Sequence, residues 1–141
     1  WDEVSFWDDS KATNFHAALA AMDALGAQNV PVFWIGGGSP KGGNLDDFAA
    51  VLAPKIEAAF LYGTAASSLA VRLTAQRARV HAYPQFADAV IAATKAALAQ
   101  SPAAVLLSPG FASFDQFSSY AERGKSFIST VLSLKDADRP N

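Results

Sequence analysis

The sequence contains no cysteine. This absence excludes a disulfide framework, a thiolate nucleophile and a cysteine-based zinc site together. It is consistent with a reducing compartment, so we expect a cytoplasmic location. Long hydrophobic runs are also missing, because Gly, Pro or charged residues interrupt each apolar stretch well short of the roughly 18 residues that span a bilayer. We therefore expect no membrane partner.

Charge of either sign is scarce. Charged residues make up 17% of the chain, and 11 Lys and Arg against 13 Asp and Glu give a net charge of -2. Because no block of basic residues stands out, we expect no nucleic-acid partner. Apolar residues are abundant instead, at 51% of the 141 residues. That is enough to build the core of a single domain.

Short β-type runs alternate with longer helical patterns along the chain. Strands are expected at Glu3–Trp7, Val30–Ile35, Ile56–Tyr62, Ala78–Ala82 and Ala103–Leu107. Helical periodicity marks Lys11–Leu25, Pro84–Ala99 and Phe117–Leu134, and another helix is expected near Asp46. This alternation predicts an α/β fold, a three-layer Rossmann-like domain whose mostly parallel sheet has helices on both faces. Asp136–Asn141 is expected to be a polar, frayed tail.

Ligands of such folds bind at the loops that follow the carboxyl ends of the strands. The first of these loops is Asp8–Asn14. Asp9 or Ser10 is expected to cap the following helix, which would put Lys11 in its first turn. The helix dipole disfavours a cation there, whereas free N–H groups beside a lysine suit an anion. The residues alone leave a plain cap and an anion site both open.

The second loop, Gly36–Asn44, is rich in glycine and contains Lys41. A P-loop would have Gly directly before the lysine and Ser or Thr directly after it, and a dinucleotide-binding fingerprint would have a third Gly where Lys41 stands. The loop therefore matches neither signature. A flexible turn into the next helix and a loop that brings Lys41 to an anion both remain possible.

The third loop, Ser108–Gln116, contains Pro109 and Gly110, which are expected to turn the chain. Ser113 or Asp115 is expected to cap the final helix. The phenylalanines of this region are expected in the core: Phe111, Phe114 and Phe117. No Ser/His/Asp arrangement and no metal-ligand spacing is found, so neither a metal site nor a catalytic residue is expected within this domain alone.

Taken together, the three loops resemble those of the carboxy-terminal domain of the Mur ligases, in the branch that adds D-glutamate. Residues 9–14 resemble the DSKATN box of that family, and residues 107–127 resemble its LSPxxASxDQF…ERGxxF segment. Gly36–Gly42 stands where the family has its glycine-rich lysine loop. The resemblance covers nearly the whole chain in the right order. Related Mur and folylpolyglutamate ligases share the domain but lack these two boxes.

The resemblance implies that residues 1–135 form a Mur ligase carboxy-terminal-type domain. The family's UDP-binding domain and central ATPase domain would precede Trp1, so we expect the chain to be the third domain of a longer, monomeric ligase. That ligase would use ATP and Mg²⁺ to join D-glutamate to UDP-N-acetylmuramoyl-L-alanine during peptidoglycan precursor synthesis. The isolated domain would bind no cofactor tightly and would be inactive.

The resemblance also implies the roles of individual residues. The residues that would hold D-glutamate are Thr13, Lys41, Ser113, Phe114 and Tyr120. The residues that would meet the nucleotide are Asp9, Lys11 and Asn14, with the Asp9 carboxylate toward the ribose and the Lys11 ammonium toward the phosphates. Two alternatives stay open. One is a stand-alone α/β module that binds a small acidic ligand. The other is a degenerate, non-catalytic homologue, because Ser39 and Pro40 precede Lys41 where the family has an acidic residue.

Overall fold

Five parallel strands form one sheet in the order β1-β5-β2-β3-β4. The computed structural model describes residues 1–39, 43–113 and 115–138. The strands are β1 (Val4–Asp8), β2 (Val32–Gly37), β3 (Ala58–Tyr62), β4 (Val80–Tyr83) and β5 (Ala103–Gly110). Each neighbouring pair is parallel. The predicted sheet is therefore confirmed, and each strand begins and ends within three residues of its expected position.

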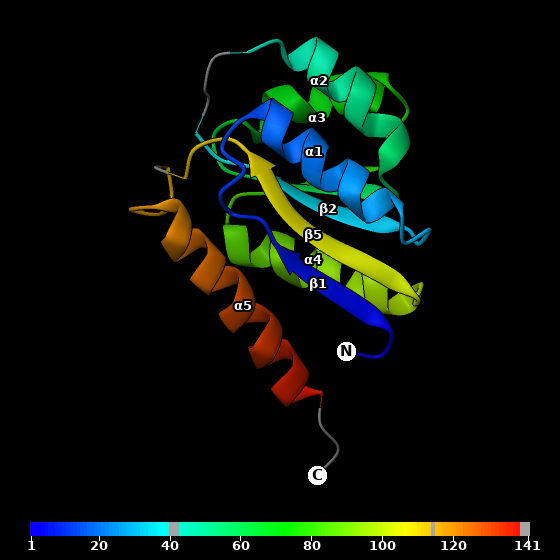
Figure 1. The fold of residues 1–141 in the computed structure, drawn as a ribbon. Coiled ribbons are helices and arrows are strands. Elements are labelled where there is room, and N and C mark those ends of the chain that lie inside the picture. The colour runs from blue at the N-terminus through cyan, green and yellow to red at the C-terminus, as the bar shows by residue number, and fades with distance from the viewer. Residues whose placement is uncertain (40–42, 114, 139–141) are drawn as a thin grey trace.

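Helices cover both faces of the sheet, as predicted. They are α1 (Phe15–Gly26), α2 (Leu45–Leu52), α3 (Ala66–Ala75), α4 (Phe86–Ala99) and α5 (Tyr120–Ala137), with a short 3-10 turn, η1, at Ala53–Lys55. Helices α1, α2 and α3 lie on one face, and α4 and α5 lie on the other (Figure 1). The three-layer α/β fold expected from the sequence is the fold observed.

The alternation of side chains along a strand divides the core between the two faces. On β2, Val32 and Trp34 pack with α1, α2 and α3, whereas Phe33 and Ile35 pack with α4 and α5. All four side chains are buried. A strand that is covered on both faces has no polar side, which is why β2, β3 and β5 are nearly continuous apolar runs in the sequence.

Helix α1 begins later than its periodicity suggested, at Phe15. Asn14 is its N-cap, and its side-chain oxygen accepts a hydrogen bond from the Ala17 amide at 2.9 Å. The expected cap at Asp9 or Ser10 is therefore wrong, and Lys11 does not lie in a helical turn. The reason is that the Asp9 amide donates to the Leu107 carbonyl at 2.8 Å, so the chain stays alongside β5 instead of coiling.

The other helix ends also differ from expectation. Ser119 caps α5 by accepting from the Glu122 amide at 3.3 Å, so the expected caps Ser113 and Asp115 are wrong. Helix α4 begins at Phe86, two residues after its expected start at Pro84. Helix α3 was not predicted, and no side chain caps its first turn. Helix α5 continues through Ala137, into the segment expected to be a tail.

Pro109 lies inside β5, a central strand, although a turn was expected there. Ile35 of β2 pairs with Leu107 and Gly37 pairs with Gly110, so β5 contains one more residue than β2 over this stretch. This is a β-bulge. A proline cannot donate to the ladder, and a bulge is a place where a sheet tolerates one. The bulge therefore lets β5 continue to Gly110.

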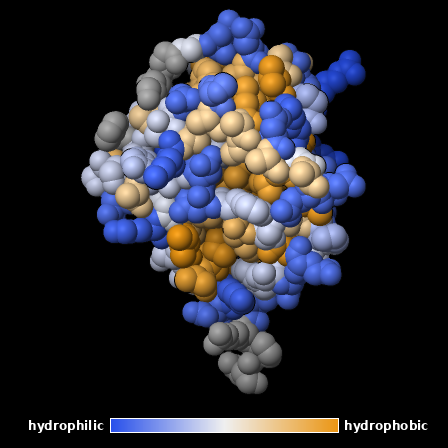
Figure 2. Space-filling view, in the orientation of Figure 1, coloured by the Kyte–Doolittle hydropathy of each residue, from blue (hydrophilic) through white to orange (hydrophobic). Residues whose placement is uncertain are grey.

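An apolar groove of about 330 Å³ runs between β1 and α5. Its lining includes Phe6, Phe127, Ile128 and Leu132, of which Ile128 and Leu132 are about half exposed. Hydrophobic side chains gather here at the lower left of the face in Figure 2.

Within the described part of the chain, no helix is both long enough and apolar enough to cross a membrane.

Candidate functional site

The loops at the carboxyl edge of the sheet are joined to each other by backbone hydrogen bonds. We call residues 9–14 the β1 loop, residues 38–44 the β2 loop and residues 111–119 the β5 loop. The Gly110 amide, in the last residue of β5 before the β5 loop, donates to the Ala12 carbonyl of the β1 loop at 2.8 Å. The Ser39 amide of the β2 loop donates to the Ala112 carbonyl at 2.9 Å. The parts of these loops that the structure describes therefore form one surface.

The β5 loop continues across the edge toward β3 and β4. The Asp115 carboxylate accepts from the Thr64 amide, just after β3, at 3.2 Å. The Gln116 side chain accepts from the Phe86 amide, just after β4, at 3.0 Å. The β5 loop thus contacts the segments that follow β2, β3 and β4, at the edge where α/β folds bind ligands.

A buried arginine of α5 lies beneath the loops. Arg123 is 0% exposed. Its Nη2 donates to the Ser10 carbonyl of the β1 loop at 3.1 Å and to the Phe111 carbonyl of the β5 loop at 2.9 Å. Its Nη1 donates to the Tyr62 hydroxyl at the end of β3 at 3.0 Å. A single side chain therefore contacts two loops and a strand end.

Arg123 is held by hydrogen bonds to neutral acceptors. Among the described residues, no Asp or Glu forms an ion pair with it. Its Nε has no hydrogen-bond partner there either. Burial raises the pKa of the Tyr62 hydroxyl above its ordinary value, although the adjacent guanidinium opposes this shift. Tyr62 is therefore a neutral acceptor for the arginine at physiological pH.

The structure places three of the predicted ligand residues around one hollow. Asp9, Lys11 and Tyr120 line a space of about 300 Å³ that also includes Lys125. Lys11 and Lys125 are exposed, and Tyr120 is 42% exposed. Residues predicted for the nucleotide and for D-glutamate thus lie on the same hollow, where Lys11 is exposed and Lys125 is paired with Glu122 at 3.7 Å.

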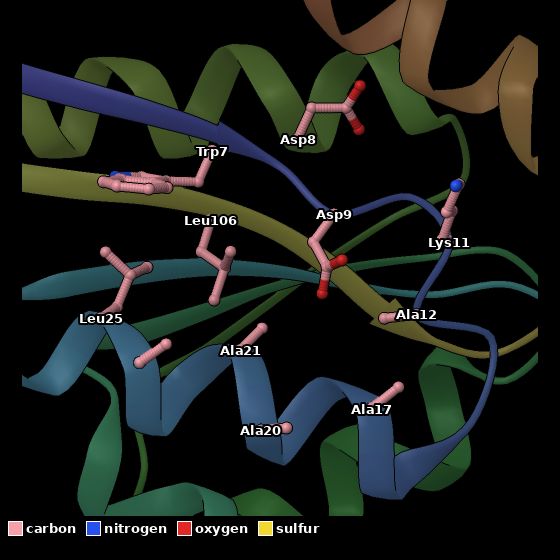
Figure 3. A pocket seen from close by; sticks show the side chains of 11 residues that line it. Trp7, Asp8, Asp9, Lys11, Ala12, Ala17, Ala20, Ala21, Leu25 and Leu106 are labelled. Atoms are coloured by element: carbon pink, nitrogen blue, oxygen red, sulfur yellow. The ribbon is translucent and has the colours of Figure 1, made fainter.

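A larger groove of about 580 Å³ extends from Asp9 and Lys11 along α1. Figure 3 shows Trp7 and Leu106 on one side of it and the small side chains of α1 on the other. Asp8 and Asp9 project in different directions from the chain (Figure 3). Only Asp9 is held by another segment, because its Oδ2 accepts from the Ser108 hydroxyl at 2.8 Å.

The other predicted site residues differ in their exposure and in their hydrogen bonds, and two of them are not described. Ser113 is 2% exposed and Thr13 is half-buried. The side-chain oxygen of Asn14 accepts the capping hydrogen bond from the Ala17 amide of α1, and its amide nitrogen is a donor. Lys41 and Phe114 lie outside the described residues. The hydrogen bond from the Ser39 amide to the Ala112 carbonyl shows that the described residues flanking these two positions lie at the same edge of the sheet.

Sequence reasoning missed the residues that hold the loops together. Arg123 was part of a recognised motif but was given no role. Tyr62 was placed in a strand and Ser108 in the third loop, and neither was given a role. A signal for Arg123 existed. Arg123, Phe127 and Val131 recur at intervals of four, and all three are on the buried face of α5. An arginine in register with core residues is an indication that its guanidinium is buried.

These features define a class, a Rossmann-like α/β domain that gathers its loops and a buried cation at the carboxyl edge of a parallel sheet. A family model for the glutamate ligase domain of Mur ligases matches residues 2–111, and the chain therefore belongs to that family. The family resemblance drawn from the loop motifs is thus confirmed.

Individual relatives agree with this assignment. The chain is 41% identical over 134 residues to a protein of Rhizobium meliloti named UDP-N-acetylmuramoylalanine–D-glutamate ligase; the match covers 94% of this chain and 28% of the relative. It is 37% identical over 154 residues to the protein of the same name from Nocardia farcinica, covering 96% and 31%. The chain therefore spans less than a third of the length of these relatives.

Proposed function

We propose that this domain works within a longer ATP-dependent ligase that adds D-glutamate to UDP-N-acetylmuramoyl-L-alanine. The observation that carries the proposal is the meeting of the β1, β2 and β5 loops, which bear the family's motifs, at one edge of the sheet. The names of the relatives give the proposal its substrates. The domain's task would be to hold D-glutamate and to close over the nucleotide.

D-glutamate carries two carboxylates, which require cations and N–H or hydroxyl donors. The residues proposed to supply them are Thr13, Lys41 and Ser113, with Phe114 and Tyr120 beside the ligand. Tyr120 lies on the hollow that also contains Lys11 and Lys125. Because that hollow is open, contacts there are weakened by water and salt until another part of the ligase covers it.

ATP would meet the β1 loop. The proposed contacts are the Asp9 carboxylate with the ribose, the Lys11 ammonium with the phosphates, and the Asn14 amide nitrogen. Ser108 holds Asp9 in place, whereas Lys11 is exposed and is not ion-paired in the described part of the chain. This arrangement combines a fixed hydrogen-bond acceptor with a movable cation, as a polyphosphate ester requires.

The chemistry would be amide formation through an acyl phosphate. ATP transfers its terminal phosphoryl group to the carboxylate of UDP-N-acetylmuramoyl-L-alanine. The amine of D-glutamate then attacks the acyl carbon, and a C–N bond forms. The C–O bond to the phosphate breaks, phosphate leaves, and the amine loses a proton. This domain would contribute by bringing the amine to the acyl carbon. No group of three metal-ligating side chains exists among the described residues, so no step is assigned to Mg²⁺ on this domain.

Steady-state kinetics of the full-length ligase tests this function. Phosphate release should depend on both D-glutamate and UDP-N-acetylmuramoyl-L-alanine. Lys41→Ala should raise the KM for D-glutamate about tenfold to a hundredfold, because a charge-assisted hydrogen bond is worth about 1.5–3 kcal/mol. Lys95→Ala is the matched control, since Lys95 is an exposed lysine on α4. An unchanged KM in Lys41→Ala would remove that residue from the site.

The isolated chain should release no phosphate from ATP and should bind D-glutamate only at millimolar concentrations or above, because it supplies only part of the site. Isothermal titration calorimetry measures this affinity directly. Micromolar binding to the isolated chain, with no ligation by the full-length protein, would instead support a stand-alone module for a small acidic ligand.

A further inference from the structure

We propose that Arg123 is a positioning residue that fixes the distance between the β1 loop and the β5 loop. This distance would set where the nucleotide and D-glutamate lie relative to each other. The inference rests on the proposed function for the roles of these loops. Arg123 is fully buried, so it acts through the backbone of the loops and not by contact with a ligand.

The hydrogen bonds of Nη2 are the first support. This single nitrogen donates to the Ser10 carbonyl at 3.1 Å and to the Phe111 carbonyl at 2.9 Å. It has two hydrogens, and each is directed to a different loop. Neither loop can move away from the other without breaking one of these bonds. The two carbonyls are therefore held at a distance set by the guanidinium.

The β2 loop is packed against the same side chain. Gly38 has a φ of +135°, and a Cβ at this position would lie 3.2 Å from Nη1 of Arg123. The same Cβ would overlap the Ala112 carbonyl oxygen. Only glycine lets the backbone pass this close at such a φ. All three loops therefore meet at one guanidinium, although they follow three different strands.

The chemistry of the side chain is the second support. Burial of a charge without a carboxylate partner disfavours folding, and well-packed apolar residues often serve stability better. What an arginine offers is a planar fork of five donors in a fixed geometry. Here the fork matches two carbonyls and the Tyr62 hydroxyl. A lysine ammonium in the same place cannot match all three directions at once.

Kinetics of the full-length ligase provides the first test. Arg123→Lys should raise the KM for D-glutamate at least tenfold and lower kcat, measured per folded molecule. Phe127→Leu is the matched control, because Phe127 is buried one turn further along α5, in the apolar core that includes Phe33 and Val105 of the sheet. It should lower the melting temperature and leave both KM values within threefold of the wild type.

Amide hydrogen exchange of the 141-residue chain provides a test that does not depend on activity. The Ser39 and Gly110 amides form the hydrogen bonds that join the loops. Arg123→Lys should speed their exchange at least tenfold more than it speeds exchange in the centre of β2. Phe127→Leu should speed exchange in both places equally. If Arg123→Lys does not fold, exchange in the wild type still tests the proposal. The Ser39 and Gly110 amides should then open together, with opening equilibrium constants that agree within threefold.

The outcomes separate the two claims. A full-length protein with no D-glutamate-dependent phosphate release overturns the proposed function, and the exchange measurement then decides the role of Arg123. An active ligase in which Arg123→Lys behaves like Phe127→Leu in both kinetics and exchange overturns the inference. Independent opening of the Ser39 and Gly110 amides in the wild type overturns it as well.

Discussion

The Ser108 hydroxyl donates a hydrogen bond to the Asp9 carboxylate across 2.8 Å, although 99 residues separate them in the sequence. The carbonyl of the same serine accepts from the Trp34 indole of β2 at 2.9 Å. Ser108 is 0% exposed and its bond with Trp34 is buried, whereas the bond to the half-buried Asp9 is only partly buried. An acidic side chain proposed to meet the ribose is thereby tied to the two central strands of the sheet.

Ser108→Ala should loosen the hold on Asp9. We expect the KM for ATP in the full-length ligase to rise about two- to tenfold, because one hydrogen bond contributes about 0.5–1.5 kcal/mol. The KM for D-glutamate should change less. Thr94→Val is the matched control, since it also removes a buried hydroxyl, which on α4 donates to the Val90 carbonyl of the same helix. Equal KM values in the two variants would contradict the prediction.

Gly124→Ala should destabilise the chain. A Cβ there would lie 2.7 Å from the Ser10 hydroxyl and 2.8 Å from an Asp8 carboxylate oxygen. The gain in helix propensity is about 1 kcal/mol, and overpacking costs about 1–3 kcal/mol, so the clash should outweigh the gain. Gly26→Ala is the control, because nothing lies within 4 Å of its Cβ. Urea unfolding should show a loss for the first variant and no loss for the second.

Alkaline pH should weaken the fold through Tyr62. Its folded-state pKa is raised above the ordinary value of 10.0, mainly by burial. Below pH 10 both the folded and the unfolded chain keep this proton, and the contribution to stability is complete. Above that pH the unfolded chain releases the proton first, so the free energy of unfolding falls by up to about 1.4 kcal/mol per pH unit. Tyr62→Phe should flatten this decline between pH 10 and 12, and an unchanged slope would contradict the assignment.

Asn14→Ala should lower the free energy of unfolding by about 1 kcal/mol, because it removes the N-cap of α1. Asn14→Asp keeps an acceptor oxygen at the cap and should stay close to the wild type. The aspartate variant lacks the amide nitrogen proposed to meet the nucleotide, so it should still raise the KM for ATP. Denaturant unfolding and steady-state kinetics together separate the two roles of this side chain.

The fold was predictable because a strand that is buried on both faces of the sheet is a nearly continuous apolar run in the sequence. The apolar runs of β2, β3 and β5 marked the centre of the sheet, and alternation with helices fixed the parallel direction. The helix ends were not predictable from these apolar patterns. Asp9 is a good capping residue by type, yet its backbone amide is taken by Leu107, a partner far away in the sequence.

The candidate site was predictable in its loops but not in its interior. Motif residues such as Asp9 and Ser113 could be located because exposed loops carry their chemistry in residue type and spacing. The connections through Arg123 and Tyr62 depend on which side chains the fold brings together. Local sequence showed only that Arg123 shares a helix face with Phe127 and Val131.

The position of Arg123 also affects the order in which the domain is completed. Its contact with Ser10 joins residues that are 113 positions apart, and α5 is the final element of the described chain. Because domains are synthesised from the amino terminus, the five strands and four of the helices emerge from the ribosome before this arginine does. A nascent chain halted after β5 would therefore have every strand of its sheet and both carbonyl acceptors, Ser10 and Phe111, but not the side chain that holds them together.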